Sequence, residues 1–99
     1  MQSVLKNISS SYTPVQITGV STLFNNATFW AISGFNANGT PVYNTNVVYL
    51  GVNNSGQLPI AIQTGGCYSA TAYPRENRDN LFNYWISGPV GGVFVTYSN

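Results

Sequence analysis

The chain has 99 residues, of which 43% are hydrophobic and only 5% are charged, and its formal net charge is +1. This length suits one domain with a single hydrophobic core, and the apolar content argues against disorder. Because there is no basic stripe and no apolar run of membrane-spanning length, we expect the chain to bind neither nucleic acid nor a membrane. No signal peptide is expected either, since the N-terminal residues lack a continuous apolar segment.

Amides and hydroxyls take the place of the missing charges: Asn, Ser and Thr occur 13, 10 and 9 times. A polar but nearly uncharged surface loses little ion solvation when it is covered, so it suits close packing against a partner. The same composition also fits a β-rich domain with no particular partner. One cysteine, Cys67, excludes an internal disulfide, and we expect it to be a small apolar strand residue.

Along the first third of the chain the periodicity is that of short strands. Residues 1–12 show little pattern, and we expect a loose N-terminal arm or a short edge strand there. Alternation over residues 15–19 predicts a brief strand. Residues 27–35 predict a longer strand with an aromatic on each face, Phe29 and Trp30, as in a strand that is covered on both sides or contacts a partner.

The clearest signal is a β-hairpin over residues 46–62, NVVYLGVNNSGQLPIAI. Its first half alternates with the two-residue period of a strand, a turn cluster (NNSG) follows, and the second half resumes the alternation. We expect Val48, Leu50 and Val52 to face the core of the fold.

The remaining segments predict further strands and turns. An Asn-Gly turn is expected within residues 36–41, and a small, polar strand over residues 67–73 suits the edge of a sheet. Strands are predicted over residues 81–87 and 93–97, joined by a glycine-rich turn.

Seven to eight short strands with no helical pattern predict an all-β fold, an antiparallel β-sandwich with jelly-roll or immunoglobulin-like topology. We expect residues 1–99 to form one such domain.

Five motifs in this order resemble the small β-sandwich virion proteins of tailed bacteriophages. They are ATFWAISG, NVVYLGV, LPIAI, LFNYWISG and GGVFVTY, and the resemblance covers about residues 14–97. The chain departs from the family's pattern at Gly91 and Gly92, which lack an acidic neighbour, and at the PRENRD segment, which has no counterpart.

The resemblance implies a non-enzymatic structural protein of the virion, made in the host cytoplasm, such as a capsid decoration (cement) protein or a tail accessory protein. Its implied partners are copies of itself, in a homo-oligomer such as a trimer, and a major capsid or tail protein. No cofactor or metal is implied.

Two sets of residues are candidates for an interface. If Tyr84, Ile86, Val93 and Val95 face the core, then Tyr49, Trp85 and Phe94 lie on the opposite faces of their strands, where they would form an aromatic patch. That patch suits subunit contact or, in the alternative function of a carbohydrate-binding or tail-fibre receptor-binding module, sugar stacking. Coverage of the patch by loops remains open as a third interpretation.

The second set is the charged loop Arg75, Glu76, Arg78 and Asp79, which holds four of the five charges. On an uncharged surface these side chains could orient a partner, or they could form ion pairs within the loop.

An enzyme is not expected. The chain has no His, and its only acids, Glu76 and Asp79, lie beside arginines, so ion pairing is favoured over acid–base catalysis. The same arginines disfavour a calcium site at Glu76, Asn77, Asp79 and Asn80.

Overall fold

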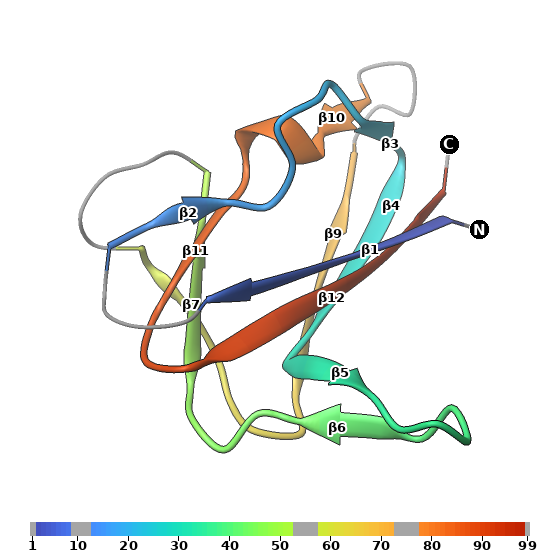
Figure 1. The fold of residues 1–99 in the computed structure, drawn as a ribbon. Coiled ribbons are helices and arrows are strands. Elements are labelled where there is room, and N and C mark those ends of the chain that lie inside the picture. The colour runs from blue at the N-terminus through green and yellow to red at the C-terminus, as the bar shows by residue number, and fades with distance from the viewer. Residues whose placement is uncertain (1, 9–12, 53–57, 73–77, 99) are drawn as a thin grey trace.

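The computed structural model describes residues 2–8, 13–52, 58–72 and 78–98, and within these ranges strands and turns predominate (Figure 1). The strands are β1 (Gln2–Ile8), β2 (Val15–Gln16), β3 (Leu23–Phe24), β4 (Asn26–Trp30), β5 (Ile32–Phe35), β6 (Pro41–Tyr43), β7 (Val48–Gly51), β8 (Ile60–Ile62), β9 (Cys67–Thr71), β10 (Asp79–Asn80), β11 (Trp85–Ser87) and β12 (Gly91–Ser98). A short turn of 3-10 helix, Leu81–Asn83, lies between β10 and β11.

Two antiparallel four-stranded sheets make up the sandwich. Sheet A has the order β1-β12-β4-β9 and sheet B has the order β2-β11-β7-β8. Among these eight strands in chain order, the first pairs with the last, the second with the seventh, the third with the sixth and the fourth with the fifth. Such nested pairing divided over two sheets is the strand order of a jelly roll. The predicted all-β sandwich is confirmed, and the strand order matches the jelly-roll alternative.

The core lies between the sheets, where the inward side chains of both meet. Most of the strand faces predicted as core are confirmed: Val48 and Leu50 are fully buried, and Ile86, Val93 and Val95 with them. Val52 is an error of the prediction, because it lies beyond the end of β7 and is 55% exposed. The buried cluster comprises Ile8, Ile17, Phe24, Ala27, Phe29, Ala31, Val48, Leu50, Ile62, Leu81, Tyr84, Ile86, Val93 and Val95.

The predicted hairpin is formed by β7 and β8, which pair antiparallel from Val48 opposite Ile62 to Leu50 opposite Ile60. Its predicted turn cluster, residues 53–56, lies outside the described ranges. Gly51 ends β7, and a Cβ there would lie 2.7 Å from Cδ2 of Leu58. Glycine at this position therefore leaves the space into which the buried Leu58 side chain packs.

Two predicted strands are interrupted. Residues 27–35 divide at Ala31: β4 stays in sheet A, while β5 leaves it and pairs with β6. Residues 81–87 begin with the 3-10 turn, which buries Leu81 and leaves Phe82 41% exposed, so the strand starts only at Trp85. In each case an alternating pattern extended past the point where the backbone changes direction.

Of the two alternatives expected for residues 1–12, a loose N-terminal arm or a short edge strand, the edge strand is confirmed and the loose arm is corrected where the structure describes the segment. Gln2–Ile8 forms an edge strand that pairs with β12 along its whole length, from Gln2 opposite Tyr97 to Ile8 opposite Gly91. Residues 1 and 9–12 lie outside the described ranges. The edge position expected of the strand over residues 67–73 is confirmed for β9 (Cys67–Thr71), which ends sheet A on the other side.

Candidate interaction surface

The outer face of sheet A carries two rows of side chains that cross all four strands. The register places Leu5, Phe94, Trp30 and Cys67 side by side, from β1 through β12 and β4 to β9. The neighbouring row consists of hydroxyl residues: Ser3, Thr96, Thr28 and Ser69. Because alternate residues of a strand point to the same face, one apolar row and one uncharged polar row lie next to each other.

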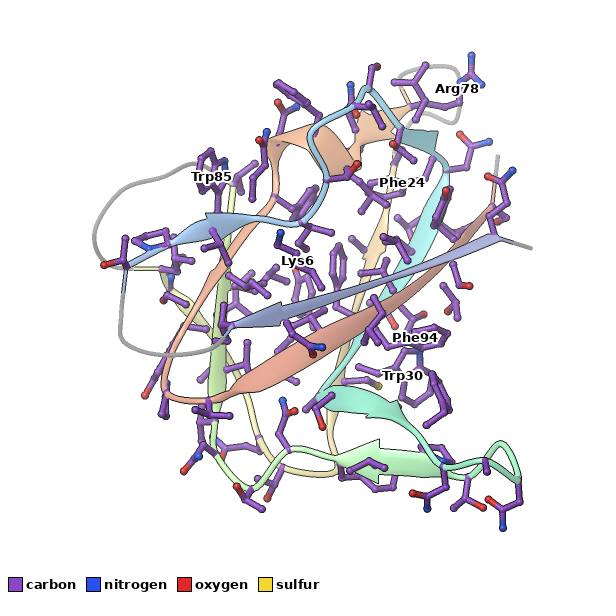
Figure 2. All side chains as sticks on the ribbon, viewed as in Figure 1. Lys6, Phe24, Trp30, Arg78, Trp85 and Phe94 are labelled. Atoms are coloured by element: carbon purple, nitrogen blue, oxygen red, sulfur yellow. The ribbon has the colours of Figure 1, made fainter. Side chains whose placement is uncertain are left out.

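The β5–β6 hairpin extends the apolar row into an aromatic groove. Phe35 packs edge-on against Phe94, with ring centroids 4.9 Å apart and planes at 80°. Figure 2 shows Phe94 and Trp30 together beside this hairpin. The groove has a volume of about 260 Å³ and is lined by Trp30, Ile32, Phe35, Pro41, Tyr43, Phe94 and Thr96.

The hairpin holds its shape through the predicted Asn-Gly turn. Gly39 donates its backbone N–H to Asn36 O at 2.9 Å, and Asn36 N–H donates to Thr40 O at 2.8 Å. Gly39 has a φ of 86°, in the left-handed region that favours glycine. This local geometry places Phe35 and Tyr43, which are 45% and 52% exposed, at the mouth of the groove.

The three aromatics predicted to form one patch lie in two different sheets. Tyr49 and Trp85 occupy neighbouring strands of sheet B, with Tyr49 opposite Ser87 and Trp85 opposite Gly51. Phe94 belongs to sheet A, and Figure 2 shows Trp85 far from Phe94. The outward direction of all three is as predicted, but the single patch is wrong because the two outer faces lie on opposite sides of the sandwich.

Half of the predicted charged loop can be placed. Arg75 and Glu76 lie outside the described ranges, while Arg78 is exposed and Asp79 is half-buried in β10. Asp79 Oδ2 accepts a 2.6 Å hydrogen bond from the Tyr84 hydroxyl, and its Oδ1 accepts one of 2.7 Å from Asn80 N–H. The chain's own donors therefore occupy this carboxylate.

Burial, together with the hydrogen bond to Asp79, affects the pKa of the Tyr84 hydroxyl. Its ring is buried against Phe24 and Phe29, with centroids 6.0 and 5.0 Å away. Burial, and after it the hydrogen bond to Asp79, raises the pKa of Tyr84 above its usual value. The hydroxyl is protonated at neutral pH and donates its hydrogen bond to Asp79.

Of the side chains considered as calcium ligands, Asn80 also has its oxygen in hydrogen bonds within the chain. Asn80 Oδ1 accepts from Thr22 N–H at 2.7 Å and from Phe82 N–H at 3.1 Å, which caps the 3-10 turn. Glu76 and Asn77 fall outside the described ranges. Among the residues that the structure places, no three His, Cys, Asp or Glu side chains gather as metal ligands would.

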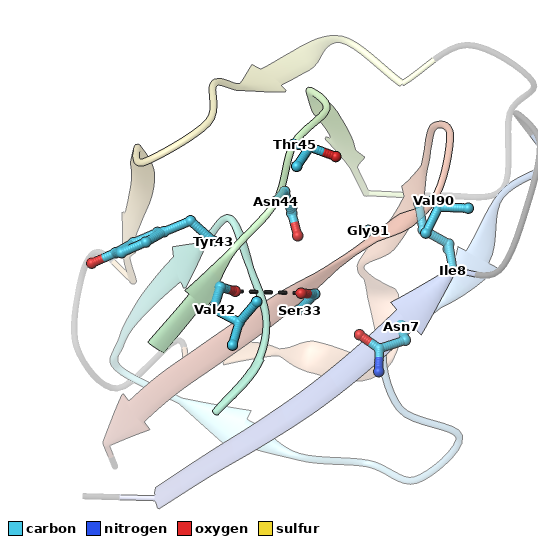
Figure 3. A pocket seen from close by; sticks show the side chains of 9 residues that line it. All are labelled: Asn7, Ile8, Ser33, Val42, Tyr43, Asn44, Thr45, Val90 and Gly91. Carbon is cyan, nitrogen blue, oxygen red and sulfur yellow. Dashed lines mark hydrogen bonds between the residues drawn. The ribbon is translucent and has the colours of Figure 1, made fainter. Parts of the chain in front are cut away.

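A second pocket, of about 390 Å³, opens at the end of the sandwich between β1 and β6 (Figure 3). Ser33 Oγ donates to Val42 O at 3.3 Å in its wall. It is lined by Asn7, Ile8, Ser33, Val42, Tyr43, Asn44, Thr45, Val90 and Gly91. The buried Asn44 is committed to the backbone of Gly92, so this pocket offers fewer free polar groups than its composition indicates.

The sequence prediction missed Trp30, Phe35 and Tyr43 as surface residues. The available signal was that both faces of residues 27–35 carry aromatics, one of which had to point away from the core. The aromatic rings of this surface can stack against a partner, and its hydroxyls can form hydrogen bonds with that partner, without the burial of a charge.

No protein-family model, no curated protein and no solved structure matches this chain. Across the ranges that the structure covers, no helix has both the length and the apolar character needed to cross a membrane.

Proposed function

We propose that this protein is a non-enzymatic structural component of a bacteriophage particle, a capsid decoration or tail accessory protein that associates with itself and binds a shell lattice. The observation that carries the proposal is the outer face of sheet A: an uncharged surface with a continuous apolar row and an aromatic groove. The assignment to a phage particle rests on the sequence resemblance.

The physical argument concerns the cost of covering this face. Burying Phe35, Tyr43 and their neighbours removes apolar area from water, which favours association. Neither cross-strand row contains an ionisable Lys, Arg, Asp or Glu side chain, so little charge must be desolvated in the complex.

The glycines of the resembling motifs have roles in the fold of sheet B. In the VYLG motif, Gly51 leaves room for the Leu58 side chain. In the WISG motif, Gly88 has a φ of 143°, and a Cβ there would lie 3.0 Å from Val47 O. These positions join β7 and β11, the central strands of sheet B. The motifs thus describe how this sandwich is built, while the function is proposed to lie in sheet A.

The test is co-sedimentation with capsids and tails purified from the phage that encodes the chain. Phe35→Ser and Tyr43→Ser are expected to weaken binding at least about tenfold, the loss expected of an interface centre. Phe82→Ser is the matched control, because Phe82 is 41% exposed against 45% for Phe35 but lies on the 3-10 turn. Failure of the unaltered protein to sediment with either particle would contradict the proposal.

The aromatic groove also favours a second candidate, a carbohydrate-binding or receptor-binding module. Sugars stack on aromatic faces and hydrogen-bond to nearby hydroxyls, and the groove borders the Ser3–Ser69 row. Binding on a glycan array that disappears in Phe35→Ser and persists in Trp85→Ala would support this function over particle binding.

A further inference from the structure

The two edges of sheet A differ in how they are protected against pairing with another strand. Edge strands expose unpaired N–H and C=O groups and are templates for strand addition, which proteins oppose with inward-pointing charges, prolines or very short strands. The edges here are β1 and β9.

Strand β1 carries such a charge. Lys6 lies opposite Val93, whose side chain is fully buried, so Lys6 is on the inward side of β1 and is half-buried. Figure 2 shows its side chain pointing from β1 towards β2, an edge strand of sheet B. A strand added beside β1 would cover the ammonium group and cost part of its hydration.

The edges of sheet B are short. β2 has two residues and β8 has three, directly after Pro59. In contrast, β9 has five residues, none of them charged or Pro, and four of the five are exposed. Among the described strands, β9 is the longest sheet edge without one of these protections.

The side chains of β9 are complementary to those of a second β9. If two copies pair antiparallel about a two-fold axis at Ser69, Tyr68 lies opposite the partner's Ala70 and Cys67 opposite the partner's Thr71. A large ring then faces a methyl group, and the two Ser69 hydroxyls can hydrogen-bond. A second copy supplies this order at every pair, because the two-fold axis repeats it.

We infer that β9 pairs with β9 of a second copy, so that two copies of sheet A become one eight-stranded sheet in an isologous dimer. This inference rests on the proposed self-association and names its surface. The hydroxyl row that ends at Ser69 continues into the partner's row, and the two aromatic grooves come to lie on one extended outer face. A shell lattice could then be bound by both grooves at once.

The test uses charge at the axis. In Ser69→Lys two ammonium groups would face each other, and the dimer dissociation constant is expected to rise roughly tenfold or more, because like charges directly opposite repel. Ser3→Lys is the matched control: Ser3 ends the same row on β1, and its substitution should leave the dimer unchanged. Mixing Ser69→Lys with Ser69→Glu should restore association as a heterodimer.

Sedimentation velocity over a range of concentrations measures the oligomeric state and the dimer dissociation constant of each protein. A wild-type monomer or trimer, equal effects of the two lysine substitutions, or no restoration in the mixture would overturn the inference. A monomer that still sediments with phage particles would refute the β9 dimer while leaving particle binding intact. A β9 dimer that does not sediment with particles would support the β9 pairing and refute particle binding.

Discussion

At the scale of single residues, the Asn44 side chain forms the two backbone hydrogen bonds that a neighbouring strand would otherwise form with β12. Its side chain is 5% exposed, Nδ2 donates to Gly92 O at 2.8 Å, and Oδ1 accepts from Gly92 N–H at 3.0 Å. The carboxamide thus pairs with β12 as a neighbouring backbone would. Gly91 has its Cβ position 3.2 Å from Asn44 Cγ, which explains a small residue beside the contact.

We therefore expect Asn44→Ala to lower the free energy of unfolding by about 2–4 kcal/mol, since it leaves a buried N–H and C=O of Gly92 without partners. Urea denaturation measures the change. Asn46→Ala is the control: Asn46 is exposed and its contacts are 3.4 Å long, so a change within about 0.5 kcal/mol is expected. Equal losses in the two variants would refute the role of Asn44.

Tyr84 gives the fold a predictable dependence on alkaline pH. Its raised pKa in the folded state means that unfolded chains release the proton first, above about pH 10, so stability is present below that pH and declines as the pH rises. We expect the stability difference between the wild type and Tyr84→Phe to shrink above pH 10. Urea titrations at pH 7 to 11 test this, and parallel stability curves for the two proteins would contradict it.

At the scale of elements, turn chemistry was the more dependable signal and strand length the less dependable one. The Asn38-Gly39 turn formed as predicted because its geometry depends on neighbouring residues alone. The strands over 27–35 and 81–87 broke because long-range bonds redirect them. Ala31 donates to Gly66 O at 3.2 Å, and Leu81 donates to Thr22 O at 2.9 Å.

For the β5–β6 hairpin, Gly39→Ala is expected to cost about 1–2 kcal/mol of stability, because φ is 86° there and an L side chain is strained. Gly19→Ala is the control, since a Cβ meets nothing within 4 Å and φ is not positive. Thermal unfolding compares them. If Gly39→Ala were neutral, the turn would have to adopt another conformation.

At the scale of the whole molecule, the first and last strands close the fold. β1 lies along β12 through seven residue pairs, and Ile8, at its end, is 4% exposed within the core. Because these strands are separated by almost the full sequence, their pairing comes with a large loss of chain entropy. The weak periodicity of residues 1–12 leaves a loose arm and a short edge strand as alternatives and does not indicate the partner strand.

We accordingly expect Ile8→Ala to lower the free energy of unfolding by about 2–4 kcal/mol as a core truncation. Leu5→Ala, which changes an outward side chain that is 39% exposed, should cost less than about 1 kcal/mol. Denaturant unfolding of both variants distinguishes an integral strand from a loose arm, for which both substitutions would be neutral.

The sequence by itself determined which side chains of Val48–Gly51 and Val93–Tyr97 point inward and that the chain turns at Asn38-Gly39, because alternation and turn residues are local properties. It also indicated that Tyr49, Trp85 and Phe94 point outward. Only the tertiary structure decided that Phe94 joins Trp30 and Phe35 in sheet A while Trp85 lies in sheet B. Alternation tells inside from outside, but the sheet to which a strand belongs depends on pairing between segments far apart in the chain.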